Sequence, residues 1–273
     1  MNHPDISVVM PAYNAMSFIA DAVNSVLKQS LCNLELIVVD DCSTDDTWNI
    51  ISRIAEVDSR LKIIKLEDNS GSAKYPREVA VNMASADWIC WVDADDIIPY
   101  DYLEKLLLRQ QNTDADIVCS QMIAFQNNIN NVRYTLPDIS LNNNGDDILP
   151  GRVAVMKTIG SWSLNANGFL VRKSLWSGTS LFLNRDANWM DADDVSTREM
   201  ILSANKVAFS DAVYYYRIHS EAITKKLSVK KFHTLITDEC VVRMIDGEFG
   251  NKSPQGRIAR NQYLHRILSF MRL

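Results

Sequence analysis

The amino-acid sequence predicts an α/β protein: a Rossmann-like, mostly parallel β-sheet with helices on both faces, followed by a C-terminal helical extension. Short apolar runs alternate with amphipathic helical segments through the first half of the 273 residues, which is typical of a parallel sheet. Polar and acidic residues follow several of these runs, as expected at the ligand-binding edge of an open α/β sheet. The composition, with 47% hydrophobic and 23% charged residues, is ordinary for a globular protein.

The apolar runs of the first half have the length of buried strands, and they lie at 6–10, 34–39, 61–66, 88–92 and 116–124. After the first run, hydrophobic residues recur at helical spacing from Phe18 to Leu27. Side-chain oxygens at 43–46 can cap the start of a second helix. Further helices are expected at 77–86 and through 103–107. The order is therefore a repeated strand–helix unit.

The second half is less regular, so we expect it to cover or shape a cleft. Residues 126–147 are rich in asparagine and poor in hydrophobic residues, which indicates an exposed hairpin or loop. The elements expected beyond it are a short helix at 152–159, a strand at 168–172, a helix from about 193 to 204, and strands near 206–209 and 213–218.

Charge and composition exclude several classes of protein. The net charge of −6 argues against a nucleic-acid binder. No apolar run reaches 18 residues, and the N-terminus lacks a secretory apolar region, so a cytoplasmic protein is expected. Five cysteines without a C-x-x-C pair suggest reduced thiols and no structural zinc.

The segment 225–273 is basic, with ten Lys/Arg against four Asp/Glu. A basic helical face suits anionic lipid headgroups, so peripheral contact with the inner face of the cell membrane is one interpretation. The alternative is the solvated face of an ordinary helix. Both stay open at this stage.

The most informative stretch is 88–96, Trp-Ile-Cys-Trp-Val-Asp-Ala-Asp-Asp. A strand-length apolar run leads directly into Asp93, Asp95 and Asp96, whose like charges repel one another. A divalent cation would supply the missing positive charge, and oxygen ligands are those that Mg²⁺ and Mn²⁺ prefer. The alternative is a solvated turn in which one aspartate caps the next helix.

Other polar groups follow the first three strands. Pro11 to Asn14 follow the first, where Tyr13 offers a flat face for a base. Asp40 and Asp41 end the second, and one of them could accept an N–H of a pyrimidine or cap a helix. The loop at 69–72, with cations close behind it, suits a diphosphate. Neither a G-x-G-x-x-G fingerprint nor a phosphate-binding P-loop motif is present.

Taken together, these segments resemble glycosyltransferase family 2, the inverting enzymes with a GT-A fold. The matching segments are 7–14, 35–45, 69–71, Arg77 and 91–96, in the family's order. The resemblance implies that 1–220 form a GT-A catalytic domain. Residues 1–115 would bind the nucleotide sugar, 116–220 would bind the acceptor, and 221–273 would be the basic helical extension.

The resemblance also implies site residues. Asp95 and His219 would bind Mn²⁺ or Mg²⁺, and Arg217 would contact the diphosphate. Asp193 and Asp194 end a second Asp-Ala-Asp-Asp segment, and Asp194 would be the general base with Asp193 in support. The alternative is that both aspartates only cap a helix. The nucleotide would contact Pro11, Ala12, Tyr13, Asn14, Asp41, Ser43, Gly71, Arg77, Asp93 and Ala94.

The function implied is inverting transfer of a sugar from a nucleoside-diphosphate sugar, with UDP as the default nucleotide, to a hydroxyl of a glycan or lipid-linked acceptor. Trp162 and Asn167 are candidate acceptor contacts, although a tryptophan of this kind is more often buried packing. Homo-oligomerisation is left open. Two rival functions are a non-catalytic nucleotide-sugar binder and a haloacid-dehalogenase-type phosphatase, whose motif would lie on the first strand rather than the fourth.

Overall fold

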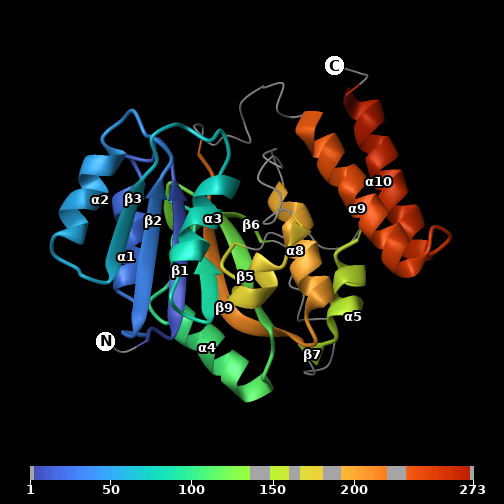
Figure 1. Cartoon of the computed structure of the whole chain (residues 1–273), viewed down its shortest axis with the longest axis horizontal. Coiled ribbons are helices and arrows are strands. Elements are labelled where there is room, and N and C mark those ends of the chain that lie inside the picture. The colour runs from blue at the N-terminus through green and yellow to red at the C-terminus, as the bar shows by residue number, and fades with distance from the viewer. Residues whose placement is uncertain (1–2, 136–147, 160–166, 181–191, 220–231, 271–273) are drawn as a thin grey trace.

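The computed structural model describes residues 3–135, 148–159, 167–180, 192–219 and 232–270. Its first half is a regular alternation of strands and helices (Figure 1). The elements are β1 (Ile6–Ala12), α1 (Ile19–Leu27), β2 (Leu34–Asp40), α2 (Thr47–Ala55), β3 (Leu61–Lys65), α3 (Lys74–Met83), β4 (Trp88–Trp91) and α4 (Tyr102–Thr113). The strands pair in parallel in the order β3-β2-β1-β4. The predicted parallel sheet is therefore confirmed.

The second half extends the same sheet. Its elements are β5 (Ile117–Gln126), β6 (Asn128–Thr135), β7 (Ile148–Leu149), α5 (Gly151–Lys157), β8 (Leu170–Arg172), α6 (Lys173–Ser177), α8 (Ala192–Ser203) and β9 (Val207–Arg217). β8 lies antiparallel between β4 and β5, and β9 runs parallel to β5. The expected exposed hairpin is formed, in its described part, by β5 and β6, which turn at Asn127 with φ 64°.

One expectation for the second half was wrong in detail. The two strands expected near 206–209 and 213–218 form a single strand, β9, which is paired with β5 on both sides of a register shift. Ser210 and Asp211 interrupt the apolar run at this irregularity, where Ser210 Oγ accepts from the backbone N–H of Ala212. In the sequence, Ser210 and Asp211 resemble the end of a strand. In the structure they lie at an irregularity in the pairing, and the strand continues beyond them.

Both faces of the sheet are buried, because neighbouring residues of a strand point to opposite sides. On one face, Val8 and Val38 pack with hydrophobic residues of α1 and α4. On the other face, Val9 and Val39 belong to a core that includes residues of α3, α5, α6 and α8. The helices on both faces therefore leave the carboxyl ends of the strands as the edge where polar loops can meet.

The C-terminal segment folds as two long helices, α9 (His233–Phe249) and α10 (Pro254–Phe270). They pack against each other beside α8 (Figure 1). Val241 and Ile245 of α9 and Ala259 of α10 are buried in the same core as the sheet. None of the helices in the described ranges has the length and hydropathy needed to cross a membrane.

Candidate active site

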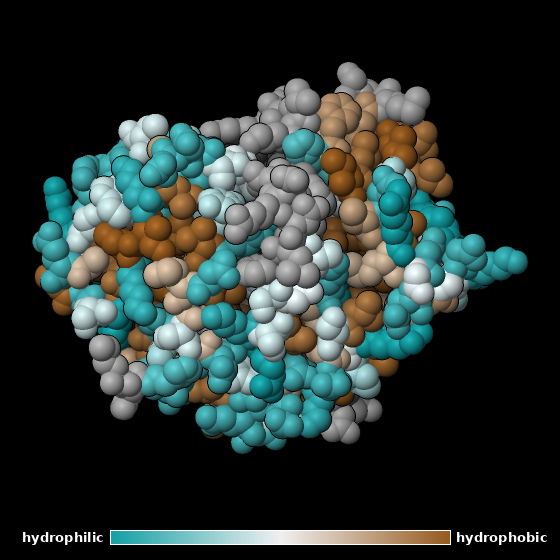
Figure 2. Space-filling model, in the orientation of Figure 1, coloured by the Kyte–Doolittle hydropathy of each residue, from teal (hydrophilic) through white to brown (hydrophobic). Residues whose placement is uncertain are grey.

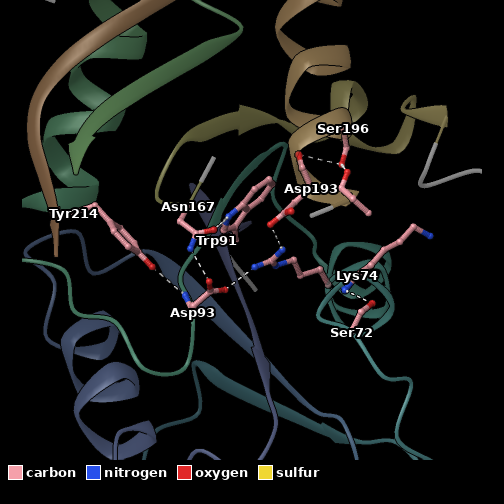
Figure 3. A network of polar contacts seen from close by, with 10 residues as sticks. Ser72, Lys74, Trp91, Asp93, Asn167, Asp193, Ser196 and Tyr214 are labelled. Atoms are coloured by element: carbon pink, nitrogen blue, oxygen red, sulfur yellow. Dashed lines mark hydrogen bonds and ion pairs between the residues drawn. The ribbon is translucent and has the colours of Figure 1, made fainter. Parts of the chain in front are cut away.

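The loop after β4 holds Asp93 at the centre of a polar network (Figure 3). Asp93 Oδ1 accepts a hydrogen bond from Arg77 Nη2 at 2.8 Å, and Oδ2 accepts from Asn167 Nδ2 at 2.6 Å. The backbone N–H of Asp93 donates to Tyr214 Oη at 3.1 Å. Three elements, α3, the loop before β8, and β9, therefore fix the orientation of this carboxylate.

Arg77 links this aspartate to the helix that carries the second acidic pair. Its Nη1 lies 3.2 Å from Asp193 Oδ2, and its guanidinium lies over the Trp91 ring, 5.4 Å from the centroid. Burial by itself would lower the pKa of Arg77, but the carboxylates of Asp93 and Asp193 raise it above its usual range. Arg77 is therefore a permanent cation that joins the loop after β4 to Asp193, which lies 116 residues after Arg77 in the chain.

Asn167 completes the support of Asp93. Its Oδ1 accepts from Trp91 Nε1 at 2.6 Å, and the residue is only 2% exposed. Trp91 packs edge-on against Trp176. An asparagine that was expected as an acceptor contact thus lies buried behind the carboxylate, although this placement does not test the acceptor role. The other expected acceptor residue, Trp162, lies outside the described residues.

Asp96 is buried and hydrogen-bonded within the protein. It is fully buried, and its carboxylate accepts from Tyr214 Oη at 2.7 Å and from the backbone N–H of Arg217 at 2.8 Å. Burial, together with the charges of Asp95 and Asp93, raises the pKa of Asp96 well above its usual value. Asp96 joins the turn after β4 to the end of β9.

Asp95 and His219 form the pair that could bind a metal. Asp95 Oδ2 lies 2.8 Å from His219 Nε2, and the Asp95 side chain is 32% exposed. This separation resembles that of neighbouring ligands on one octahedral cation, which is about 3 Å when metal–oxygen distances are about 2.1 Å. A carboxylate and an imidazole also suit Mn²⁺ chemically. The two side chains therefore fit a divalent cation.

The described residues contain no group of three or more His, Cys, Asp or Glu side chains that could hold a metal ion. Two protein ligands leave most positions of a cation to water and to substrate oxygens, as is usual for Mg²⁺ at phosphate sites. Arg217 lies beside the pair, because its Nε donates to the backbone oxygen of Asp95 at 2.7 Å. Its guanidinium lies over the rings of Phe18 and Phe125.

The loops after β1, β2 and β3 are tied to one another at the same edge of the sheet. Asn14, with φ 49°, donates its backbone N–H to Ser43 Oγ at 2.9 Å. Asp41 accepts from the backbone N–H and hydroxyl of Ser70 at 2.8 and 2.9 Å. Burial raises the pKa of Asp41 despite these hydrogen bonds. These hydrogen bonds join the three loops into a rim beside Tyr13, which is 43% exposed.

The remaining predicted nucleotide residues lie on or beside this rim. Pro11 and Ala12 end β1, and Ala12 is 2% exposed. Ala94 lies between Asp93 and Asp95 in the chain and is 7% exposed. Gly71 has φ 82°, a conformation that favours glycine. The structure therefore brings the predicted nucleotide residues to one edge of the sheet.

Asp193 and Asp194 lie in the first turn of α8. Asp194 Oδ1 is 3.1 Å from Arg198 Nη1, and its side chain is 39% exposed whereas that of Arg198 is 9% exposed. Burial raises the pKa of Asp194; Arg198 opposes this and Asp193 adds to it. The two aspartates thus have different partners, with Asp193 facing Arg77 and Asp194 facing Arg198.

Sequence reasoning missed Trp91, Tyr214 and Arg198 as parts of the site. A buried indole N–H needs a hydrogen-bond partner, so Trp91 was a signal that a polar group lies behind the strand. Nothing in the sequence indicated that this group is Asn167. Tyr214 lies far along the chain from Asp93 and Asp96, and no local pattern distinguishes it. Arg198 follows Asp194 by four residues, the spacing of an ion pair on one helix face, and this local signal was overlooked.

The parallel sheet of the first half, the aspartates after β4 and the acidic pair on α8 are the features expected of a glycosyltransferase of the GT-A class. The profile of the family described as Glycosyl transferase family 2 matches residues 7–159, and the chain belongs to this family. This membership sets aside the phosphatase alternative.

Several proteins that are similar in sequence to this chain are named as glycosyltransferases. Glycosyltransferase GlyG of Streptococcus pneumoniae is 27% identical over 231 residues, which cover 81% of this chain and 73% of that protein. The putative teichuronic acid biosynthesis glycosyltransferase TuaG of Bacillus subtilis is 43% identical over 104 residues, covering 38% of this chain and 41% of its own length.

A crystal structure of Staphylococcus aureus TarS, residues 1–349, in complex with UDP-GlcNAc has the same fold, with a TM-score of 0.69. The superposition covers 97% of this chain and 73% of the TarS chain at 23% identity. At this identity the likeness establishes the fold, and the predicted GT-A architecture is confirmed.

Proposed function

We propose that this protein transfers a sugar from a UDP-sugar to a hydroxyl of a glycan or lipid-linked acceptor, with inversion at the anomeric carbon. The observation that carries the proposal is the Arg77 bridge, which joins Asp93 after β4 to Asp193 beside Asp194. A donor bound at the sheet edge would thereby face the acidic pair of α8. That TarS is known in complex with UDP-GlcNAc supports a uridine donor here.

The nucleotide would occupy the rim formed by the first three βα loops. Tyr13 offers an exposed ring for stacking, and Asp41 offers a carboxylate for the base edge. Asn14 and Ser43 hold these loops together through their hydrogen bond. The fixed rim limits the conformational entropy that is lost when a donor binds.

Asp95 and His219 would hold Mn²⁺ or Mg²⁺, and such an ion supplies Lewis-acid stabilisation to a departing diphosphate. Arg217 adds a fixed positive charge next to Asp95. Arg77 pairs with both Asp93 and Asp193, so its positive charge offsets part of the negative charge that these two carboxylates bring to the site. These groups favour the negative charge that grows on the leaving group.

Asp194 would act as general base. The acceptor oxygen attacks the anomeric carbon from the face opposite the diphosphate, its proton passes to Asp194, and the breaking bond's electron pair leaves with the diphosphate. A raised pKa makes Asp194 a better proton acceptor than an ordinary surface aspartate. Asp193, held by Arg77, would fix the first turn of α8.

The test is Asp194→Asn, which keeps the size of the side chain and removes its basicity. We expect kcat to fall by at least about 100-fold, the lower end of general-base effects, while calorimetry shows unchanged UDP affinity. Asp211→Asn is the matched control, because the Asp211 side chain is 83% exposed on β9. Normal transfer by Asp194→Asn would refute the base assignment, and UDP binding without transfer by the unaltered protein would favour the non-catalytic alternative.

A further inference from the structure

The helix that carries the acidic pair is covered by the C-terminal helices, which lie beyond the residues matched by the family profile. α9 packs against α8, and α10 packs against α9 (Figure 1). Val195, in the same turn of α8 as Asp194, shares a buried core with Val241 and Ile245 of α9. The turn of α8 that carries Asp194 is therefore packed against a segment that begins at His233, well after the family match ends.

The face of α9 that packs inward carries a charge. Thr234, Thr237, Val241 and Ile245 are buried at helical spacing, and Asp238 lies on the same face. The Asp238 side chain is 16% exposed, and its Oδ2 lies 2.6 Å from Arg266 Nε of α10. A second ion pair, between Arg243 and Glu239, lies on the outer face of α9, where the Arg243 side chain is 78% exposed.

The inner ion pair lies close enough to Asp194 for their charges to interact. The charge of Arg266 lowers the pKa of Asp194, in the same direction as that of Arg198. Burial raises the pKa of Asp238, and the charge of Asp194 raises it further. Asp194 thus stands among two cations, Arg198 and Arg266, and two anions, Asp193 and Asp238.

Several other charged groups of the helices around α8 have partners of their own. Arg152 of α5 pairs with Glu248, Arg260 pairs with Asp246, Lys173 donates to the Ala84 carbonyl, Glu199 accepts from Ser180, and Arg77 contacts Asp193. Lys157 of α5 is also charged, but it is present in every variant described below and so cannot cause a difference between them.

We propose that Asp238 and Arg266 are positioning residues that set the charge balance at Asp194, so that the C-terminal helix pair completes the base site. This inference rests on the proposed role of Asp194 as base. An ion pair that only stabilised the fold would gain nothing from a half-buried place on the face toward α8, where desolvation opposes it. The Asp238–Arg266 pair is therefore placed to influence Asp194, whereas the outer Arg243–Glu239 pair is not.

The test uses the full chain and the pH profile of kcat/KM, whose acid limb reports the pKa of the base in the free enzyme. Arg266→Gln removes a cation, so the pKa of Asp194 should rise and the acid limb should move to higher pH. Asp238→Asn removes an anion and releases Arg266 from its partner, so the limb should move to lower pH. We expect each shift to be about half a pH unit or more.

The opposite signs distinguish electrostatics from structural damage, because a misplaced helix pair would shift both variants in the same direction. In the double variant the two shifts should largely cancel, so that the pH profile returns toward that of the unaltered protein. Arg266→Lys keeps the positive charge, and its acid limb should lie at the same pH as that of the unaltered protein. Arg243→Gln is the matched control on the outer face and should leave the limb in place. Shifts of the same sign, or none in either single variant, would overturn the inference.

A second readout does not depend on activity. The Asp194 carboxyl can be titrated by ¹³C NMR without donor, with the resonance assigned by its loss in Asp194→Asn. If the NMR titration shifts in both variants as expected but the kinetic limb does not, the charge coupling holds and the assignment of Asp194 as base fails. If the NMR titration is unmoved while Asp194→Asn is inactive, the base assignment stands and this inference fails.

Discussion

Three neighbouring aspartates after β4 have three different environments. Asp93 is neutralised by Arg77, Asp95 faces His219, and Asp96 is buried against Tyr214 and the end of β9. In the sequence, the repulsion expected among these three carboxylates indicated a functional site. In the structure each carboxylate has its own partner, which reduces this repulsion. Only Asp95 keeps a partly exposed oxygen next to a potential metal ligand, and the metal hypothesis therefore depends on Asp95 and His219.

At the residue scale, Asp95→Ala should weaken Mn²⁺-dependent UDP binding by at least about 10-fold, because it removes a proposed ligand. Calorimetric titration of UDP, with Mn²⁺ and then with a chelator, measures this. The affinity in chelator should be nearly the same for the variant and the unaltered protein. Asp211→Ala, at an exposed position of β9, is the control. Equal Mn²⁺-dependent affinities would remove Asp95 from the metal site.

At the element scale, the short strand β8 is aligned by the turn that precedes it. Gly168 has φ 81°, and its backbone N–H donates to the Trp91 carbonyl at 2.8 Å. A Cβ at Gly168 would lie 2.2 Å from Tyr102 Oη and 2.5 Å from a ring carbon of Tyr214. The turn therefore needs glycine, both for its backbone conformation and for the close approach of two tyrosines.

We expect Gly168→Ala to lower the free energy of unfolding by about 3 kcal/mol, because it combines overpacking with an unfavourable φ. Urea unfolding measures the change. Activity should fall as well, since Asn167, the preceding residue, holds Asp93. Gly247→Ala is the matched control: nothing lies within 4 Å of the added Cβ in α9, and alanine in a helix should stabilise by about 0.5–1 kcal/mol. A Gly168→Ala protein as stable as the unaltered one would contradict the argument.

At the scale of the whole molecule, hydrophobic side chains gather on the outer surface of the C-terminal helix pair, seen as brown atoms over α9 and α10 in Figure 2. The exposed residues near the start of α9 and the end of α10 are Phe232, Ile236, Leu264 and Leu268, which are 43–55% exposed. An exposed patch of this kind suits a membrane surface or another protein. It lies at the opposite end of the molecule from α2 (Figure 1).

If this surface meets lipid, Leu264→Glu with Leu268→Glu should reduce co-sedimentation with anionic vesicles several-fold, because each change removes apolar contact and adds repulsion. Transfer to a soluble acceptor should be little changed. Val57→Glu is the control, since Val57 is 85% exposed beyond α2. Unchanged sedimentation would exclude this patch as a membrane contact, and a shift in light-scattering mass would point instead to contact between copies of the chain.

Much of the fold could be read from local patterns. The strand at 88–92 and the helix at Phe18 to Leu27 were recognisable because hydrophobic spacing reports burial directly. The location of the candidate site was also predictable, because acidic and polar loops that follow parallel strands meet at one edge of the sheet. The roles of its residues stay predictions. The merged strand β9 was not readable, because Ser210 and Asp211 break the apolar pattern without ending the hydrogen-bonded ladder.

By itself, the sequence determined the family, the parallel first half and the acidic edge of the sheet, because each depends on residues close together in the chain. Only the tertiary structure decided that Arg77 joins Asp93 to Asp193, that Asn167 and Tyr214 hold the turn, and that the C-terminal helices close over α8. Such contacts join residues that are far apart in the chain, and the packing of whole elements selects them; no local spacing encodes which side chains will meet.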